Sequence, residues 1–183
     1  MSQGQPNIAL TGFMGTGKTT IGREVARLLD RRFYDFDQKI EERMKISVKE
    51  IFEKYGEVFF RDMESKIVAE FVNQTDLVIA TGGGTLLFKD NLTSLSKNSV
   101  IFCLTAPKGI LIKRLENSFG RPLLAGGTLN ERIECLLNER ESLYQELPNP
   151  IDTTNLSVAE TASKIIEIYN QHLLANKSNE DKK

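Results

Sequence analysis

Eight residues near the N-terminus constrain the fold more than any other part of the chain. They read Gly12-Phe13-Met14-Gly15-Thr16-Gly17-Lys18-Thr19, they follow the apolar run from Ile8 to Leu10, and amphipathic periodicity begins directly after them. Glycines let backbone N–H groups approach an anion closely at the positive end of a helix. The spacing predicts a P-loop between a strand and a helix that runs to about Leu29.

The P-loop predicts which residues contact a nucleotide. Lys18 is expected to reach the β- and γ-phosphates, and Thr19 is expected to give its hydroxyl to Mg²⁺. A dinucleotide fingerprint is disfavoured because the third glycine position holds Thr20. The alternative is a glycine-rich turn that only joins strand to helix. The predicted ATP contacts in this loop are Gly15, Thr16, Gly17, Lys18, Thr19 and Thr20.

The rest of the chain alternates short apolar runs with longer amphipathic ones, which favours an α/β fold with a parallel sheet between helical layers. The predicted strands are Ile8 to Leu10, Arg32 to Asp35, Leu77 to Ala80, Val100 to Leu104 and, weakly, Ile151. Capping boxes predict helix starts at Ser47 with Glu50, Thr128 with Glu131 and Ser157 with Glu160. We expect one domain over residues 1–175 and a disordered polar tail from Asn176 to Lys183.

Composition and charge limit the kinds of partner and the cellular location that we expect for this chain. A net charge of -1 and a pI near 6.0 provide no basic field for nucleic acid, so we expect small-molecule partners and a monomer. No signal-peptide pattern or membrane-length apolar run occurs, which favours the cytoplasm. The two cysteines, Cys103 and Cys135, are interpreted as reduced core thiols, and the single histidine, His172, cannot support a zinc cluster.

Two aspartates follow the second predicted strand. If the extended conformation continues through Phe36, Asp35 and Asp37 point to the same side, at the sheet edge where α/β proteins bind ligands. Hydrated Mg²⁺ or a bound hydroxyl would relieve the repulsion between the two carboxylates. The alternative is that Asp37 caps the following helix.

Two arginines differ in their helical neighbours. Arg140 lies within an apolar stripe of the helix from Leu129 to Leu147, with no acid at three or four residues' distance, so it needs a tertiary or bound anion. The alternative is that the aliphatic part of the Arg140 side chain packs on the apolar surface while the guanidinium group reaches solvent. Arg61 has Glu57 and Glu64 within one turn, and helical spacing alone favours an ordinary surface ion pair. The predicted stripe comprises Leu129, Ile133, Leu136, Leu137, Leu143, Tyr144 and Leu147.

Two glycine-rich segments complete the pattern. Gly82, Gly83 and Gly84 close the third predicted strand, where the main chain can lie flat against a ligand or form a tight loop. The segment from Glu116 to Gly127 joins two helices and contains Arg121 between glycines. It is typical of a lid that closes over a site and brings positive charge, or it is a passive surface loop.

In order and approximate spacing, these motifs resemble those of the shikimate kinases. The resemblance rests on the P-loop, Asp35-Phe36-Asp37, Phe60-Arg61-Asp62-Met63-Glu64, the triple glycine, Arg121-Pro122-Leu123-Leu124, and Arg140 with Tyr144. It implies a P-loop kinase three-layer sandwich, with a five-stranded parallel sheet, helices on both faces and a lid. It also implies transfer of the γ-phosphoryl group of ATP to the 3-hydroxyl of shikimate.

The resemblance further implies residue roles. Asp37, Arg61, Arg140 and the loop Gly82 to Gly84 hold shikimate, with the arginines on its carboxylate. Asp35 binds the water shell of Mg²⁺. Arg121 contacts the phosphates from the lid, Arg114 lies against adenine, and the stretch from Asp152 to Asn155 contributes Asn155 on the adenine side.

These residues suggest a mechanism in which charge neutralisation is the main contribution. Lys18, Mg²⁺ on Thr19, and Arg121 offset charge on the transferring group. Asp37 holds the attacking hydroxyl, and the sequence leaves open whether it also acts as a general base. Lys18, Asp37 and Arg121 are therefore the candidate catalytic residues. The rivals are another metabolite or nucleotide kinase on the same fold, such as a gluconate kinase, and a non-catalytic ATP-binding module. A GTPase is disfavoured because no Asn-Lys-x-Asp motif occurs.

Overall fold

The computed structural model describes residues 4–116 and 128–180. Five strands form one sheet in which every neighbouring pair is parallel, in the order β2-β3-β1-β4-β5. This confirms the predicted α/β class and its parallel five-stranded sheet. The strands are β1 (Asn7–Gly12), β2 (Arg32–Asp35), β3 (Leu77–Ala80), β4 (Ser99–Thr105) and β5 (Pro150–Asp152).

Helices fill most of the remaining described chain. They are α1 (Lys18–Leu29), α2 (Phe36–Met44), α3 (Val48–Phe71), the 3₁₀ turn η1 (Thr85–Leu87), α4 (Lys89–Ser96), α5 (Lys108–Leu115), α6 (Leu129–Gln145) and α7 (Val158–Glu180). The capping boxes predicted at Ser47 and Thr128 are present. Ser157 and Glu160 exchange the same hydrogen bonds before α7.

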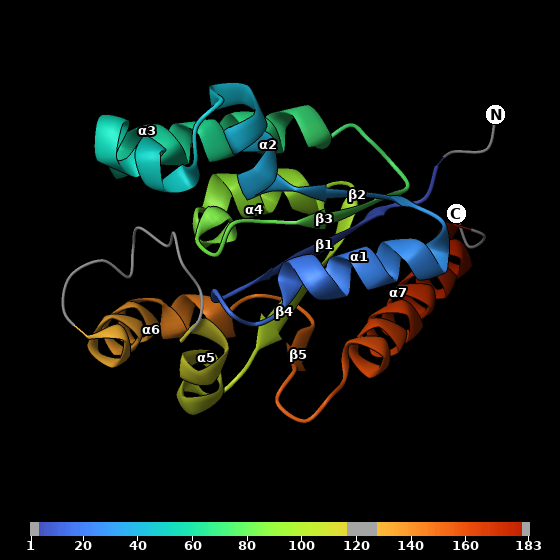
Figure 1. Cartoon of the computed structure of the whole chain (residues 1–183). Coiled ribbons are helices and arrows are strands. Elements are labelled where there is room, and N and C mark those ends of the chain that lie inside the picture. The colour runs from blue at the N-terminus through green and yellow to red at the C-terminus, as the bar shows by residue number, and fades with distance from the viewer. Residues whose placement is uncertain (1–3, 117–127, 181–183) are drawn as a thin grey trace.

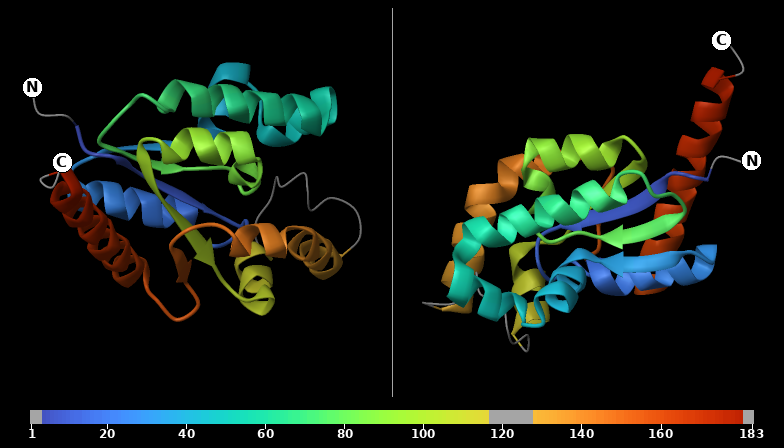
Figure 2. Two further views of the ribbon diagram at one scale, coloured as in Figure 1. Left: turned by 180° about the vertical axis from the view of Figure 1, so that it is seen from behind. Right: turned by 90° about the horizontal axis from the view of Figure 1, so that it is seen from above.

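The sheet separates two apolar clusters because successive strand residues point to opposite faces. Along β1, Ile8 and Leu10 pack with α1 and α7, whereas Ala9 packs with α3 and α4 on the other face. Figure 1 shows these helices on either side of the sheet, and Figure 2 shows the same layers from behind and from above. The result is the three-layer arrangement that the sequence predicted.

Strand order also determines where the site lies. From β1 the chain crosses through α1 to the edge strand β2, and from β3 it passes over β1 through α4 to reach β4. Connections therefore leave β1 and β3 in opposite directions, which opens a crevice at the carboxyl ends of these neighbouring strands. The P-loop follows β1 and the triple glycine follows β3, so both glycine-rich segments border this crevice.

The structure corrects the predicted tail. The sequence predicted disorder from Asn176, but α7 continues to Glu180. A helix that is already formed extends at little cost, because each added residue brings its own hydrogen bond without a new nucleation step. Residues 181–183 lie outside the described part of the chain. No helix within the described ranges is long and apolar enough to cross a membrane.

The two cysteines differ in exposure. Cys103 is fully buried in β4, and burial raises the pKa of its thiol to about 11. The prediction of a core thiol is wrong for Cys135, which is exposed on α6 beside Glu139, 3.3 Å away. Helical periodicity placed Cys135 next to apolar positions, but it lies just outside the buried stripe. No group of three or more possible metal-ligating side chains occurs in the described residues.

Thiol labelling of the native protein tests this difference. Because Cys103 is fully buried and Cys135 is exposed, a maleimide near pH 8 is expected to modify Cys135 alone, although Glu139 raises the pKa of the Cys135 thiol as well. Cys103 should react only after unfolding in denaturant. Intact-mass and peptide mass spectrometry report both steps, and rapid labelling of Cys103 in the folded protein would contradict the packing of β4.

Candidate active site

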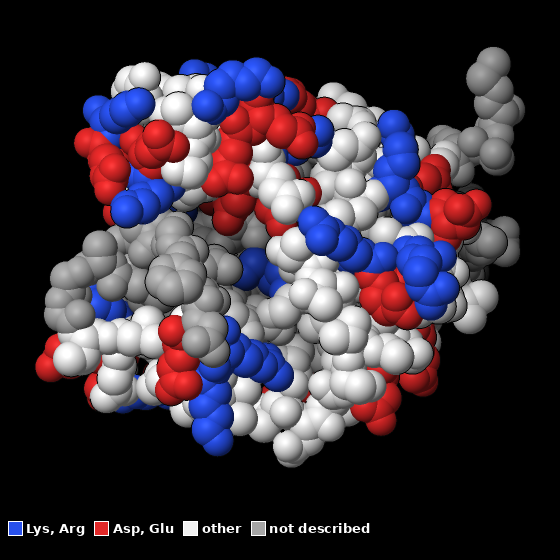
Figure 3. All heavy atoms as spheres, in the orientation of Figure 1, with Lys and Arg blue, Asp and Glu red and all other residues white. Residues whose placement is uncertain are grey.

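The larger of two adjoining cavities lies in the crevice and has a volume of about 620 Å³. Figure 3 shows a hollow on this face of the molecule, with acidic side chains above it and basic side chains in its floor. The P-loop and the start of α1 form one wall. The lining residues used below are Gly15, Thr16, Gly17, Lys18, Thr19, Thr20, Asp35, Asp37, Gly83, Arg114, Thr153 and Leu156.

Gly12 and Gly17 show why the backbone of the P-loop requires glycine. A side chain at Gly12 would place its Cβ 2.1 Å from the carbonyl oxygen of Leu104, and Gly12 has a φ of 129°. Gly17, at the N-cap of α1, has a φ of 98°. Lys18 folds back over this loop, and its Nζ donates to the carbonyl oxygens of Gly12 at 2.9 Å and Phe13 at 3.1 Å. The first-turn amides of α1 thus border the cavity beside a lysine ammonium group.

Thr19 and Asp35 lie together at the cavity wall. The Thr19 hydroxyl donates to Asp35 Oδ2 at 2.7 Å, while Asp35 Oδ1 accepts from the backbone N–H of Asp37 at 3.1 Å and caps α2. The predicted extended conformation is wrong because α2 begins at Phe36, so Asp35 rather than Asp37 is the cap. Asp37 instead occupies the first helical turn, where the helix dipole favours a carboxylate, and its side chain still reaches the cavity.

Arg114 is anchored between the P-loop and the segment after β5. Its guanidinium donates to the Thr153 hydroxyl at 2.9 Å, the Thr153 carbonyl at 2.8 Å and the Gly15 carbonyl at 3.3 Å. Thr153 in turn donates toward the carbonyls of Thr105 at 3.1 Å and Thr16 at 3.3 Å. Asn155 is exposed and does not line the cavity, whereas Thr153 and Leu156 do.

The smaller cavity, of about 60 Å³, lies between α2, α3, the triple glycine and α6. It shares Asp37, Val48 and Gly83 with the larger cavity, so the two adjoin. The sequence assigned Asp37, Arg61, Arg140 and the three glycines to the substrate, whereas it gave no role to Glu64 or to the apolar side chains of the cavity wall. The lining residues are Met14, Asp37, Val48, Phe52, Phe60, Arg61, Glu64, Gly82, Gly83, Gly84 and Arg140.

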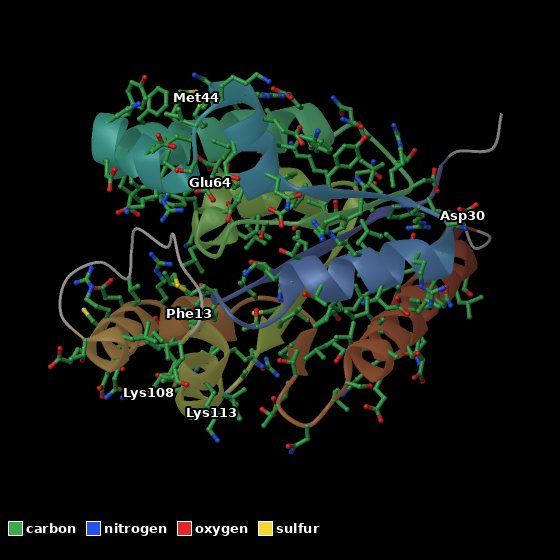
Figure 4. The ribbon with its side chains drawn as sticks, in the orientation of Figure 1. Phe13, Asp30, Met44, Glu64, Lys108 and Lys113 are labelled. Carbon is green, nitrogen blue, oxygen red and sulfur yellow. The ribbon has the colours of Figure 1, made fainter. Side chains whose placement is uncertain are left out.

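Arg61 is held from two sides by carboxylates. It donates to Glu64 Oε2 at 2.6 Å and to Glu57 Oε1 at 2.6 Å, and these carboxylates outweigh the opposing effect of burial and raise the pKa of Arg61. The predicted pairing with both glutamates is confirmed, but the expectation of an ordinary surface pair is wrong for Glu64, because its side chain is 0% exposed and that of Arg61 only 14%. Glu64 also accepts from the Thr85 hydroxyl. Figure 4 shows Glu64 beneath α3, on the side that faces the sheet.

Arg140 lacks such a partner. It is half-buried on α6, lines the smaller cavity, and pairs with no carboxylate among the residues that the structure describes. The apolar stripe around it is confirmed for Ile133, Leu136 and Tyr144, but Leu143 is 38% exposed. A cationic side chain at the wall of a cavity, without an internal counter-ion, is suited to an anionic ligand.

Three buried residues of the site lie within stretches that the resemblance includes, but the sequence assigns them no role in the site. These residues are Glu64, Tyr144 and Thr153. Their roles depend on their burial and on their tertiary contacts. Neither of these can be read from a single sequence. Arg121 and nearly all of the predicted lid lie outside the described residues.

A P-loop beside an Mg²⁺-compatible hydroxyl and carboxylate, joined to an acceptor pocket with a basic wall, defines the class of P-loop small-molecule kinases. A family model described as shikimate kinase matches residues 14–170. The chain belongs to the shikimate kinase family and is an ATP-dependent kinase that acts on shikimate.

Relatives and solved structures agree with this assignment. The shikimate kinase of Thermodesulfovibrio yellowstonii is 44% identical over 89% of this chain and 94% of its own, and that of Pelotomaculum thermopropionicum is 40% identical over 91% and 96%. A shikimate kinase from Acinetobacter baumannii, solved in complex with shikimate, has a TM-score of 0.85 at 37% identity, over 94% of this chain and 95% of its own. A gluconokinase from Sinorhizobium meliloti, 13% identical with a TM-score of 0.59, shares the fold alone.

Proposed function

We propose that this chain transfers the γ-phosphoryl group of ATP to the 3-hydroxyl of shikimate, with the triphosphate in the larger cavity and the acceptor over the smaller one. The observation that carries the proposal is the junction of the two cavities at Asp37 and Gly83. A phosphoryl group moving from one ligand to the other must cross such a junction, since donor and acceptor react only when they are held in contact.

The donor side is supported by the P-loop and the Arg114 anchor. Backbone amides at the start of α1, together with Lys18, are placed to offset the negative charge of the β- and γ-phosphates. Arg114, held by Thr153, offers a guanidinium face on which an adenine ring can stack. Arg121 is proposed to add positive charge from the lid, in keeping with the sequence prediction.

Mg²⁺ fits the pair formed by Thr19 and Asp35. A hydroxyl and a carboxylate are hard oxygen groups, and Mg²⁺ prefers a few such groups together with water and phosphate oxygens. We propose that Thr19 binds the ion directly and that Asp35 accepts hydrogen bonds from its water shell. When bound, the ion neutralises negative charge on the phosphates.

The acceptor side is proposed to bind shikimate by both ends. Arg140 and Arg61 face the carboxylate, while Asp37 accepts a hydrogen bond from the 3-hydroxyl and points it toward the donor. The glycine loop contributes backbone N–H groups. Phosphoryl transfer through a loose transition state needs little deprotonation beforehand, so the main role of Asp37 is to orient the hydroxyl and to take its proton as the bond to phosphorus forms.

A coupled ADP assay tests the proposal. With ATP and Mg²⁺, ADP release is expected to rise sharply on addition of shikimate, and to stay near background with gluconate or a nucleoside monophosphate as acceptor. Stimulation by one of these other acceptors in place of shikimate would assign a different kinase activity. ATP binding with no acceptor-dependent ADP release would favour the non-catalytic module. Monomeric state, cytoplasmic location and the absence of a nucleic-acid partner stay predictions from the sequence.

Replacing Arg140 with alanine tests the acceptor pocket. Loss of a charge-assisted contact is expected to raise the KM for shikimate by about 10- to 100-fold, while the KM for ATP changes little. Initial-rate kinetics with each substrate varied in turn measure both constants. Arg27→Ala is the control, since Arg27 is an exposed arginine paired with Glu24 on α1. An unchanged KM for shikimate in Arg140→Ala would remove Arg140 from the acceptor site.

A further inference from the structure

The buried hydroxyl of Tyr144 makes a contact that the proposed mechanism does not use. It donates to the carbonyl oxygen of Gly83 at 2.6 Å. The ring is 9% exposed and packs edge-on against Phe13 of the P-loop, with 6.4 Å between ring centroids. Phe13, labelled in Figure 4, lies beside α6. Burial raises the pKa of Tyr144 to about 12, so the hydroxyl keeps its proton and donates at any working pH.

Gly83, which accepts the hydrogen bond from Tyr144, is part of the site. It lines both cavities, and a Cβ placed on it would lie 3.5 Å from the Gly12 carbonyl oxygen and 3.9 Å from the Tyr144 hydroxyl. Gly83 therefore sits against the P-loop on one side and the acceptor cavity on the other. Its position affects the alignment of acceptor and donor.

Three consecutive glycines leave this loop with few internal constraints, because glycine restricts the backbone less than any other residue. Among the described residues, the N–H groups of Gly83 and Gly84 donate no hydrogen bond to the protein. Because a trans peptide is planar, holding the Gly83 carbonyl toward α6 also fixes the direction of the Gly84 N–H. The hydroxyl of Tyr144 thus sets the orientation of one donor, the Gly84 N–H, which is available to a ligand.

We propose that Tyr144 is a positioning residue for the acceptor: its hydroxyl holds the peptide between Gly83 and Gly84 so that the Gly84 N–H faces the bound anionic alcohol. This inference rests on the proposed function, since it assumes that the acceptor occupies the smaller cavity. It assigns to Tyr144 an effect on acceptor binding, with no direct contact to the reacting atoms.

A second route from Tyr144 to the acceptor must be separated from the first. Arg140 lies one turn earlier on α6 and interacts with the Tyr144 hydroxyl, which lowers the tyrosine pKa against the larger effect of burial. Removal of the hydroxyl could therefore act through Arg140 instead of through the loop. A double-mutant cycle distinguishes the two routes, because independent contributions multiply and shared ones do not.

The chain offers a matched control for the loss of one tyrosine hydrogen bond. Tyr169 on α7 is 1% exposed, and its hydroxyl donates to the carbonyl oxygen of Pro6 at 2.6 Å and accepts from the Arg31 guanidinium at 2.9 Å. The contact with Pro6 lies before β1, at the amino ends of the strands, whereas the site lies at their carboxyl ends. Figure 2 shows that the C-terminal part of α7 lies away from α5 and α6. Each phenylalanine variant therefore loses a hydroxyl that donates to a backbone carbonyl and also interacts with an arginine, but only the Tyr144 hydroxyl adjoins the site.

The experiment compares Tyr144→Phe with Tyr169→Phe in the full-length protein. Tyr144→Phe is expected to raise the KM for shikimate, and its Kd by calorimetry without nucleotide, by about tenfold, with the KM for ATP nearly unchanged. Tyr169→Phe is expected to lower the Tm without moving either KM. An unchanged shikimate KM in Tyr144→Phe, or equal changes in both KM values, would overturn the proposal.

The double variant decides the route. In the Arg140→Ala background, Tyr144→Phe is expected to raise the shikimate KM by a further factor of similar size. No further change would show that Tyr144 acts only by holding Arg140, and would overturn the assignment to the glycine loop. Failure of the wild-type protein to phosphorylate shikimate is a separate outcome, which would refute the proposed function itself.

Discussion

Lys18→Met is expected to lower kcat by a factor on the order of 10² to 10³, because it removes a cation placed to offset charge that develops on the transferring phosphoryl group. Methionine keeps much of the length and volume of the side chain but cannot donate to the Gly12 and Phe13 carbonyls. The expected loss is in turnover rather than in folding. Steady-state kinetics at saturating shikimate measure it.

The control for Lys18→Met is Lys66→Met on α3. Lys66 is 61% exposed and pairs with Asp62 on the same helix, so its replacement should leave turnover unchanged. Circular dichroism and thermal melting of both variants report whether the fold is intact. Wild-type turnover in a folded Lys18→Met protein would contradict the assignment of the P-loop.

Asp37→Asn is expected to lower kcat by a factor on the order of 10² to 10⁴, since asparagine keeps the shape of the side chain but cannot take a proton from the acceptor hydroxyl. From the first turn of α2, Asp37 lines both cavities, and among the described residues no other acid does so. Rates of ADP formation at saturating concentrations of both substrates provide the measurement.

The balance of kinetic effects in Asp37→Asn reports the role of the residue. A large loss of kcat with a small change in the KM for shikimate indicates proton transfer or orientation in the transition state, whereas a change in KM alone indicates ground-state binding. Asp90→Asn on α4 is the control, because Asp90 is an exposed acid in the first turn of another helix. Normal kcat in Asp37→Asn would exclude Asp37 as a catalytic residue.

The sequence predicted the fold and the position of the P-loop well because their signals are local. A P-loop is continuous in the chain, and its glycines, Lys18 and Thr19 are adjacent residues with fixed geometry. Parallel strands buried on both faces give continuous apolar runs, which is why the sequence predicts β1, β3 and β4 clearly. Capping boxes lie within four residues, and they correctly located the starts of three helices.

The acceptor side was harder to predict because it depends on tertiary contacts. Helical spacing paired Arg61 with Glu64 correctly, but it could not show that Glu64 is fully buried under the glycine loop. The early start of α2 was missed because the run from Phe33 to Phe36 is apolar and aromatic, which favours a strand over a helix start. Tyr144 and Thr153 gain their roles from carbonyl groups that are distant in sequence.

Identification of the reaction product tests the central claim most directly, namely that two adjoining cavities align the terminal phosphate of ATP with one hydroxyl of a carboxylated alcohol. After incubation with ATP, Mg²⁺ and shikimate, phosphorus and proton NMR are predicted to show a single phosphate ester at the 3-hydroxyl, in equal amount to ADP. Phosphate on another hydroxyl, or ADP with free inorganic phosphate and unchanged shikimate, would contradict the account.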